Sequence, residues 1–372
     1  MKITCDRNLL LAAFQIVSSI VPSRNTIPIL QNIKITTGDK SILIIGTDLE
    51  VGVRYELPAE IKEKGTILFP TQRLGAILRE SADEKIQIES DGHISQVKTE
   101  NGYFKIMGTD PADYPDFPDF DAKKAVSIES QGLKEMIRKT IFATSGEIAR
   151  YALTGVLLEI SKKELRMVGS DGKRLAYIKR KSEVEVAQNI KVIVPPKSLA
   201  LLERIIQDDN KQVLLTLEET QLKIQLSVGE DNKSSILIFS GLIEGNFPDY
   251  TNVIPSDCDK KAEVVTEEFY SAIRRAALVT TDKFKATKLI FKNNSLTLFS
   301  RTQDVGEAQV EMKAKYEGKP FEIVFNPEFF IDVLRVINEK EFTMEFKDKA
   351  SPMILKIGRN YVYLVMPLSV DV

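Results

Sequence analysis

The chain has few of the residues from which catalytic and metal centres are built. Its 372 residues include one histidine, two cysteines and no tryptophan. His93 alone cannot supply a two-histidine metal site, neither Cys5 nor Cys258 is near it in the sequence, and a solvated turn explains it best. Two cysteines make no disulfide framework and are typical of a reducing compartment, so we expect a cytoplasmic location. We expect no catalytic residue, no metal and no cofactor.

Long apolar runs and an excess of charge are also missing. No stretch approaches the ~18 apolar residues of a membrane-spanning helix, and the first residues lack a signal-peptide pattern. The composition, with 43% hydrophobic and 28% charged residues, is typical of a globular domain. The formal net charge of −2 counts against a protein that simply coats nucleic acid. Charge can be segregated between faces, however, so nucleic-acid binding stays open.

What the chain does contain is an internal repeat. Three stretches align without gaps, each with an apolar residue and then Pro or Asn at its start: 69–79, 194–204 and 325–335. A second helical stripe, with side chains at i, i+3, i+4 and i+7, recurs from Leu10, Leu133 and Phe269. The two elements keep their order and a similar spacing in every copy. We therefore predict three domain-sized repeats, each with two helices.

Strand-like segments separated by turn-forming residues fill the sequence between the predicted helices. Their hairpin spacing predicts antiparallel sheets of about seven or eight strands per repeat with helices on one face, an α+β fold. Pro- and Asp-rich segments at 110–119 and 245–255 mark stiff connectors. The expected domains are 1–122, 123–255 and 256–372, called repeats 1, 2 and 3 below.

Two aspartates are the best candidates for an enzyme. Asp48 and Asp171 could act as an acid/base pair on a polar substrate, which is one alternative function. They lie 123 residues apart, as the first helices of repeats 1 and 2 do, and such an Asp most often bonds its own turn. Because catalytic groups rarely repeat in this way, we interpret the chain as a scaffold. A structural oligomer with no role on DNA is the other alternative.

Cations recur on the predicted helices. A solvated helix face with local ion pairs is the usual explanation for such charges. Recurrence on related helices of an otherwise acidic chain favours a sequence-independent track for phosphate groups. The cations expected to face nucleic acid are Arg73, Arg79, Lys134, Arg138, Lys139, Lys197, Arg204, Arg274, Arg275 and Arg335.

Short motifs occur in order along the whole chain, at 23–32, 46–50, 150–155, 170–176, 247–250 and 366–368. In this order they resemble the bacterial DNA polymerase III beta subunits, the sliding clamps. The resemblance implies three DNA-clamp domains per chain and a head-to-tail homodimer that closes a ring around duplex DNA. Such a ring is a processivity factor in DNA replication, without catalysis or cofactor, and it tethers the replicative polymerase.

The resemblance also implies a pocket between the second and third domains for short motifs of polymerases, the clamp loader and other partners. Matching motifs place there Leu153, Ser170, Gly172, Arg174, Leu175, Pro248, Val253, Asn326, Phe329, Leu364, Met366, Pro367 and Leu368. Arg24 matches a DNA-contacting loop, although Glu147 and Ala152 depart from residues that some relatives use there. Further departures are Lys173, where relatives often carry His, and Asn252 and Ser369, where Arg is common. At the dimer seam, Phe104 would face Leu278 and Val279 of the other chain.

Overall fold

The six α-helices in the described part of the chain are those that the sequence predicts. The computed structural model describes residues 1–92, 94–181, 189–208, 210–229 and 233–369, so the interpretation of His93 lies outside the described residues. Each repeat has two α-helices in this part of the chain: α1 Arg7–Ser18, α2 Thr71–Glu80, α3 Ser130–Arg138, α4 Pro196–Ile205, α5 Thr266–Ala277 and α6 Pro327–Leu334. The starts follow local chemistry, since the carboxylate of Asp6 accepts a hydrogen bond from Leu9 N at 2.9 Å and caps α1.

The described residues of repeats 1, 2 and 3 contain nine, eight and nine strands, slightly more than expected. The extra strands are short, such as β5 and β22, and carry too few alternating positions to stand out in a sequence. Repeat 1 has β1 Lys2–Asp6, β2 Asn32–Thr37, β3 Ser41–Thr47, β4 Val51–Pro58, β5 Glu60–Glu63, β6 Thr66–Pro70, β7 Lys85–Asp91, β8 Ile94–Lys98 and β9 Tyr103–Met107. Repeat 2 has β10 Val126–Glu129, β11 Val156–Ile160, β12 Glu164–Ser170, β13 Arg174–Lys181, β14 Ile190–Val194, β15 Gln212–Glu218, β16 Gln221–Val228 and β17 Ser234–Gly241. Repeat 3 has β18 Lys260–Val265, β19 Thr287–Lys292, β20 Ser295–Thr302, β21 Gly306–Lys313, β22 Lys315–Tyr316, β23 Phe321–Phe325, β24 Glu341–Phe346, β25 Met353–Ile357 and β26 Tyr361–Val365.

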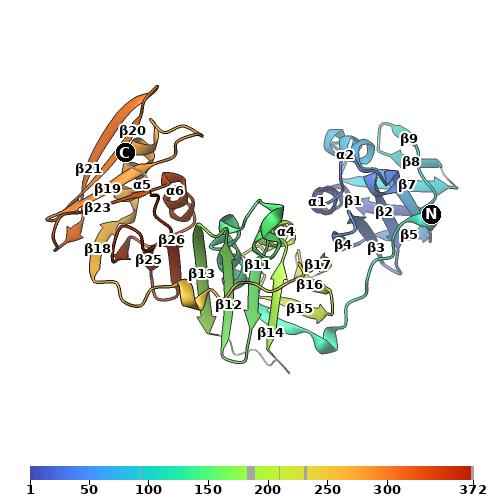
Figure 1. The fold of residues 1–372 in the computed structure, drawn as a ribbon. Coiled ribbons are helices and arrows are strands. Elements are labelled where there is room, and N and C mark those ends of the chain that lie inside the picture. Colours follow the sequence, from blue (N-terminus) through green and yellow to red (C-terminus); the bar gives the residue numbers. More distant parts are fainter. Residues whose placement is uncertain (93, 182–188, 209, 230–232, 370–372) are drawn as a thin grey trace. The chain divides into compact units, whose positions relative to one another are not determined.

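The sheets continue from one repeat into the next, which the sequence does not predict. The chain divides into two compact units, unit 1 with residues 1–131 and 201–242 and unit 2 with residues 132–200 and 243–372. Unit 1 contains the sheets β5-β1-β7-β8-β9 and β10-β15-β16-β17-β4-β3-β2-β6. Unit 2 contains the sheets β14-β11-β12-β13-β26-β25-β24-β18-β22 and β21-β20-β19-β23. The ladder β4–β17 therefore joins repeats 1 and 2, and the ladder β13–β26, visible in Figure 1, joins repeats 2 and 3.

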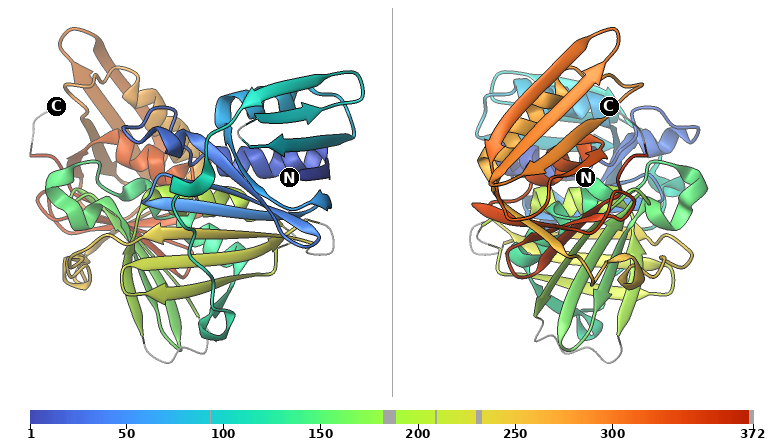
Figure 2. Two further views of the ribbon diagram at one scale, coloured as in Figure 1. Left: turned by 90° about the vertical axis from the view of Figure 1, so that its right-hand side faces the viewer. Right: turned by 60° about the vertical axis from the view of Figure 1, so that its left-hand side comes forward.

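Each unit buries its helices against its sheets. In unit 1, α1 contacts β1, β3 and β4, and its buried stripe of Leu10, Ala13, Phe14 and Val17 is the predicted one. In unit 2, α5 packs on α6, β20 and β21, as the right-hand view of Figure 2 shows. Phe269 of α5 meets Phe330 of α6 edge to face, with ring centroids 5.5 Å apart, and both side chains are fully buried. The α+β class and the three-repeat plan are confirmed.

None of the helices in the described ranges is long and apolar enough to span a membrane. A search of the same residues finds no group of three or more His, Cys, Asp or Glu side chains that could hold a metal ion.

Candidate functional site

The predicted partner pocket has an apolar floor in unit 2. Leu175 on β13 lies directly opposite Leu364 on β26, and both belong to a buried cluster that includes Phe247 and Tyr250. Leu153 packs against this cluster. Two further residues of the predicted set are unusually exposed for their type, Val253 at 50% and Met366 at 37%. A site for the apolar side chains of a short partner motif requires a buried apolar floor with exposed apolar residues nearby.

The side chain of Arg174 is held by hydrogen bonds at the predicted partner pocket and does not point freely into it. Its Nη1 donates to Oδ2 of Asp332 on α6 at 2.6 Å, its Nε to Oδ2 of Asp171 at 3.1 Å, and its Nη2 to the carbonyl of Phe142 at 2.8 Å. The guanidinium carbon lies 4.8 Å from the ring centroid of Phe329, and the side chain is 11% exposed. Because its donors are satisfied by both repeats, Arg174 positions the β12–β13 turn on α6.

Asp48 and Asp171 bond the backbone of their own turns, as the sequence predicts. Oδ1 of Asp171 accepts from the N–H groups of Lys173 and Arg174 at 2.8 and 3.0 Å. Oδ1 of Asp48 accepts from the corresponding N–H groups of Glu50 and Val51 at 3.1 and 2.8 Å. Two carboxylates with the same capping bonds explain the repeated motif as turn chemistry and give the acid/base alternative no support.

Glycine suits the turn of repeat 2, although the matching turn of repeat 1 holds Leu49 at φ +79°. Gly172 has φ +82°, and a Cβ there would clash with Nη1 of Arg150. That nitrogen donates to the carbonyl of Asp171 at 2.5 Å, and the hydroxyl of Ser170 accepts from Gly172 N at 3.1 Å. Ser170 and Gly172 therefore shape the rim of the predicted pocket through the backbone of the turn.

The remaining pocket residues come from repeat 3 and from the connector 245–255 at the end of repeat 2. Met366 N donates to the carbonyl of Lys173 at 2.8 Å, and Leu368 N donates to the carbonyl of Val324 at 2.8 Å. These bonds hold Pro367 between the β12–β13 turn and β23. Asn326 caps α6 by accepting from Glu328 N at 3.0 Å, so its side chain has a local structural role. Pro248 is exposed, in the connector that also carries the buried Phe247.

The corresponding place in repeat 1 is closed by aromatic rings. Gly52 on β4 is the position that aligns with Leu175, and a Cβ there would lie 2.8 Å from both Cδ1 and Cζ of Phe239 and closer still to Cε1. Phe117 from the connector packs edge-on against Phe239, with ring centroids 5.1 Å apart. Phe117 of repeat 1 and Phe239 of repeat 2 thus occupy the place that corresponds to the predicted partner pocket.

Most of the predicted DNA-facing cations are exposed. Arg204 donates to the hydroxyl of Ser19 at 2.5 Å, and Arg335 pairs with Asp332 at 3.5 Å while its side chain stays 59% exposed. Lys134 and Arg138 are half-buried, and Nη2 of Arg138 donates to the carbonyl of Val336 at 3.2 Å. The exposed members are Arg24, Arg73, Arg79, Lys197, Arg204, Arg274, Arg275 and Arg335.

Lys139 does not fit the DNA-facing set. Its side chain is 4% exposed, and its Nζ lies 2.9 Å from Oε1 of Glu135 and 3.0 Å from Oε1 of Glu339. The same nitrogen lies 5.3 Å from the ring centroid of the fully buried Tyr361. An ammonium that two carboxylates and a ring enclose has no free face for a phosphate, so Lys139 joins repeats 2 and 3 inside unit 2.

The residues predicted for the dimer seam are apolar and exposed. Leu278, which follows α5, is 78% exposed and Phe104 on β9 is 43% exposed, while Val279 is half-buried. Tyr103 and Met107 on β9 are 68% and 65% exposed. Large exposed apolar side chains gathered on one strand mark an interaction surface. β9 and β21 are also terminal strands of their sheets as described, so each has an edge available for pairing.

Comparison with known proteins agrees with this arrangement. Family models for the DNA polymerase III beta subunit match over their N-terminal domain (residues 1–118), central domain (127–249) and C-terminal domain (251–369). The beta sliding clamp of Chlamydia pneumoniae is 30% identical over 99% of both chains. The crystal structure of the DNA polymerase sliding clamp from Bacillus subtilis superposes with a TM-score of 0.93 at 29% identity and covers 100% of both chains. A sliding clamp from Bartonella birtlesii bound to griselimycin gives a TM-score of 0.92 at 29% identity, also over 100% of both chains.

The structure is thus that of a scaffold built from three repeats. Its two candidate catalytic carboxylates, Asp48 and Asp171, cap the backbone of their own turns. The chain belongs to the DNA polymerase III beta subunit family, the beta sliding clamps. Members of this family are non-catalytic processivity factors of DNA polymerase III.

Proposed function

We propose that two copies of this chain close head to tail into a ring around duplex DNA and bind partner proteins through the pocket of unit 2. The partners are the replicative polymerase, the clamp loader and other proteins with short binding motifs, and the site of action is the cytoplasm. The domains are those ending at residues 122 and 255. The ring is supported by the two strand ladders between repeats, which share one pairing geometry. The edge strands β9 and β21 are available to form a third ladder of the same kind.

The residue pairings of the two ladders between repeats match one another. In the first, Val51 pairs with Ser240, and Gly241 N donates to the carbonyl of Glu50 at 2.8 Å. In the second, Arg174 pairs with Val365, and Met366 N donates to the carbonyl of Lys173 at 2.8 Å. Residues 50 and 173, like 51 and 174, are 123 apart. The repeats therefore join by one rule, which is the same register of paired residues at each junction.

The same rule assigns the third junction to a second copy. In the hairpin β20–β21, Gly306 corresponds to Val51 and Arg174, because Ser300 pairs with Ala308 as Gly46 pairs with Val53 and Gly169 with Ala176. On β9, Ile106 corresponds to Ser240 and Val365, because Ser95 on the preceding strand pairs with Ile106 as Leu222 pairs with Ser240 and Met353 with Val365. Transferring the register places Gly306 opposite Ile106 of the partner, Glu307 opposite Lys105 and Ala308 opposite Phe104. An acidic side chain then meets a basic one, and Phe104 comes beside α5, which contacts β21.

DNA binding rests on exposed and half-buried cations of the helices, together with the exposed Arg24. Contacts to phosphates are independent of base sequence, and enclosure by a ring needs only weak contacts, so the ring can slide. We assign this role to Arg24, Arg73, Arg79, Lys134, Arg138, Lys197, Arg204, Arg274, Arg275 and Arg335, and leave out Lys139 because it is enclosed by protein groups.

Retention on DNA of different topology tests the ring. The chain is loaded onto nicked circular DNA with a cognate clamp loader and ATP, and the DNA is then linearised. We expect the protein to stay on circles and to leave linear DNA from its ends. Equal loss from both forms, or equal retention on both, would contradict encirclement. Loss from both by a stable dimer would favour the structural oligomer without a role on DNA.

Charge reversal tests the basic helices. The triple variant Arg79→Glu, Arg204→Glu, Arg335→Glu should load poorly and should lower the salt dependence of retention. The matched control, Lys40→Glu, Lys163→Glu, Lys319→Glu, makes the same change in net charge at exposed positions outside the helices. Equal loading defects in both variants would show that net charge, and not the helix faces, governs the effect.

A further inference from the structure

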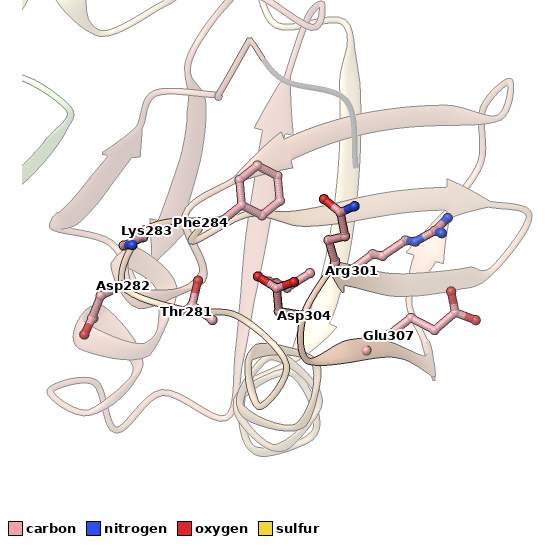
Figure 3. Close-up of a pocket in the computed structure, with 10 residues that line it drawn as sticks. Thr281, Asp282, Lys283, Phe284, Arg301, Asp304 and Glu307 are labelled. Atoms are coloured by element: carbon pink, nitrogen blue, oxygen red, sulfur yellow. The ribbon is translucent and has the colours of Figure 1, made fainter.

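Unit 2 has a large cavity beside the hairpin β20–β21. Its volume is ≈1060 Å³, and it is lined by the loop 281–284 after α5 and by residues 301–304, 306 and 307. Figure 3 shows Thr281 and Phe284 on the loop side and Arg301, Asp304 and Glu307 on the hairpin side. The lining carries charges of both signs, so it differs from the apolar floor of the partner pocket.

The cavity sits at the third of three corresponding turns. The turns between β3 and β4, between β12 and β13 and between β20 and β21 occupy the same place in their repeats. Beside the second turn lies Met366, which directly follows the buried Val365 at the end of β26. On β9, Met107 directly follows Ile106 in the same way, and Ile106 is 9% exposed while Met107 is 65% exposed. Met107 is therefore the counterpart of Met366.

We propose that Met107 of a second copy enters the cavity between the loop 281–284 and the turn 302–306. The inference rests on the proposed head-to-tail dimer, because the register that pairs Gly306 with Ile106 brings the next residue, Met107, to the mouth of the cavity. An exposed thioether chain gains by leaving water, and its flexibility suits an irregular space.

The proposal explains why a cavity of this size is present at the third turn. At the first turn, Phe239 and Phe117 fill the space from within the chain. At the third turn, the cavity and the edge of β21 belong to the same hairpin. A second copy that pairs with this edge is thereby positioned to fill the cavity. A single assembly step would then pair the edge of β21 and fill the cavity.

Cysteine cross-linking tests the placement in the full-length chain. The background variant is Cys258→Ser, and Cys5 can stay because it is 3% exposed and burial raises the pKa of its thiol to about 12. Met107→Cys is combined with Gln303→Cys in the cavity lining. The control pair combines Met107→Cys with Lys319→Cys, which is exposed and precedes β23 at the far end of the hairpin β19–β20 from the cavity.

Mild oxidation should give a covalent dimer with the Gln303→Cys pair and none with the Lys319→Cys pair. Sedimentation of the reduced proteins is measured in parallel. Reduced dimers that do not cross-link at residue 303, or that cross-link equally at residue 319, would overturn the Met107 placement while the ring stands. Reduced proteins that sediment as monomers, together with the unmodified chain, would overturn the ring itself.

A second pair of variants separates side-chain burial from strand pairing. Met107→Leu keeps an apolar side chain, and its dimer dissociation constant should stay within about threefold of the original. Met107→Asp replaces the apolar side chain with a hydrated carboxylate that would lose water on entering the cavity, and it should raise the constant by about tenfold or more. Equal constants for the two variants would show that Met107 stays in water and would contradict the proposal.

Discussion

Lys139→Met is expected to destabilise the protein without weakening its hold on DNA. The substitution keeps an unbranched side chain of similar length and removes the ammonium group. The Lys139 side chain is 4% exposed, and its ammonium group makes ion pairs of 2.9 Å with Glu135 and 3.0 Å with Glu339. Glu339 lies 200 residues further along the chain, so the ammonium connects repeats 2 and 3 within unit 2.

The size of the expected loss in stability depends on how much solvation the carboxylates of Glu135 and Glu339 recover. Breaking a fully buried ion pair by removing one partner costs roughly 3–5 kcal/mol. Here the side chains of Glu135 and Glu339 are 40% and 30% exposed, so water recovers part of their solvation, and Glu135 keeps Arg180 at 2.9 Å. The contact with the Tyr361 ring is also lost, while the methionine side chain gains from burial. We therefore expect a loss of about 2 kcal/mol, or ~4–8 °C in Tm for a unit of this size.

Urea unfolding followed by circular dichroism, with retention on circular DNA measured alongside, checks both halves of this prediction. The control is Lys163→Met at an exposed position in the turn between β11 and β12, which should change stability by less than about 0.5 kcal/mol. A Lys139→Met variant as stable as the parent would refute the ion-pair reasoning. A stable variant that slides off circles would return Lys139 to the DNA-facing set.

Three further outcomes follow from single contacts. Burial acts to raise the pKa of Glu339, but hydrogen bonds from Lys139 and from backbone N–H groups lower it overall. Its stabilisation should be complete above about pH 4.3 and lost as pH falls through the lower folded pKa, so the stability gap between parent and Lys139→Met should narrow from pH 7 to about pH 3 in urea titrations. Gly52→Ala should cost about 1–3 kcal/mol by the same assay through overlap with Phe239, and adding Phe239→Leu should restore part of it. Met366→Asp should weaken a fluorescent partner-motif peptide about tenfold or more in anisotropy without changing dimer sedimentation, and an unchanged affinity would place the peptide elsewhere.

Local features of the fold could be predicted because their signals are local. The stripe from Leu10 to Val17 has the helical period, and all four of its positions are buried on α1. The aspartates at 48 and 171 sit in short turns whose N–H groups are within reach of their own side chains, so their role follows from spacing alone. The α+β class rests on the same kind of short-range pattern.

Pairings between distant segments could not be predicted in this way. β4 and β17 are both largely buried, and nothing within either segment specifies the other as its neighbour. Lys139 aligns with the exposed Arg275, yet its environment depends on Glu339, which belongs to another repeat. Sequence comparison between repeats therefore identifies corresponding positions correctly, while the carboxylates or rings that surround each position decide what it does.

The three corresponding turns show how one fold acquires three different junctions. The position that aligns across them is Gly52, Leu175 and Glu307, with no side chain, an apolar one and a charged one. The glycine admits Phe239 and closes the first junction, and the leucine contributes to an apolar floor beside the exposed Met366. The glutamate lines a polar cavity on a hairpin with an available edge, and by the transferred register it faces Lys105 of a second copy. A ring needs its seams and its partner sites to be different surfaces, because a partner peptide that fitted every junction would compete with closure. The residue at this one aligned position contributes to that separation, since it changes what the neighbouring strand can bury against it.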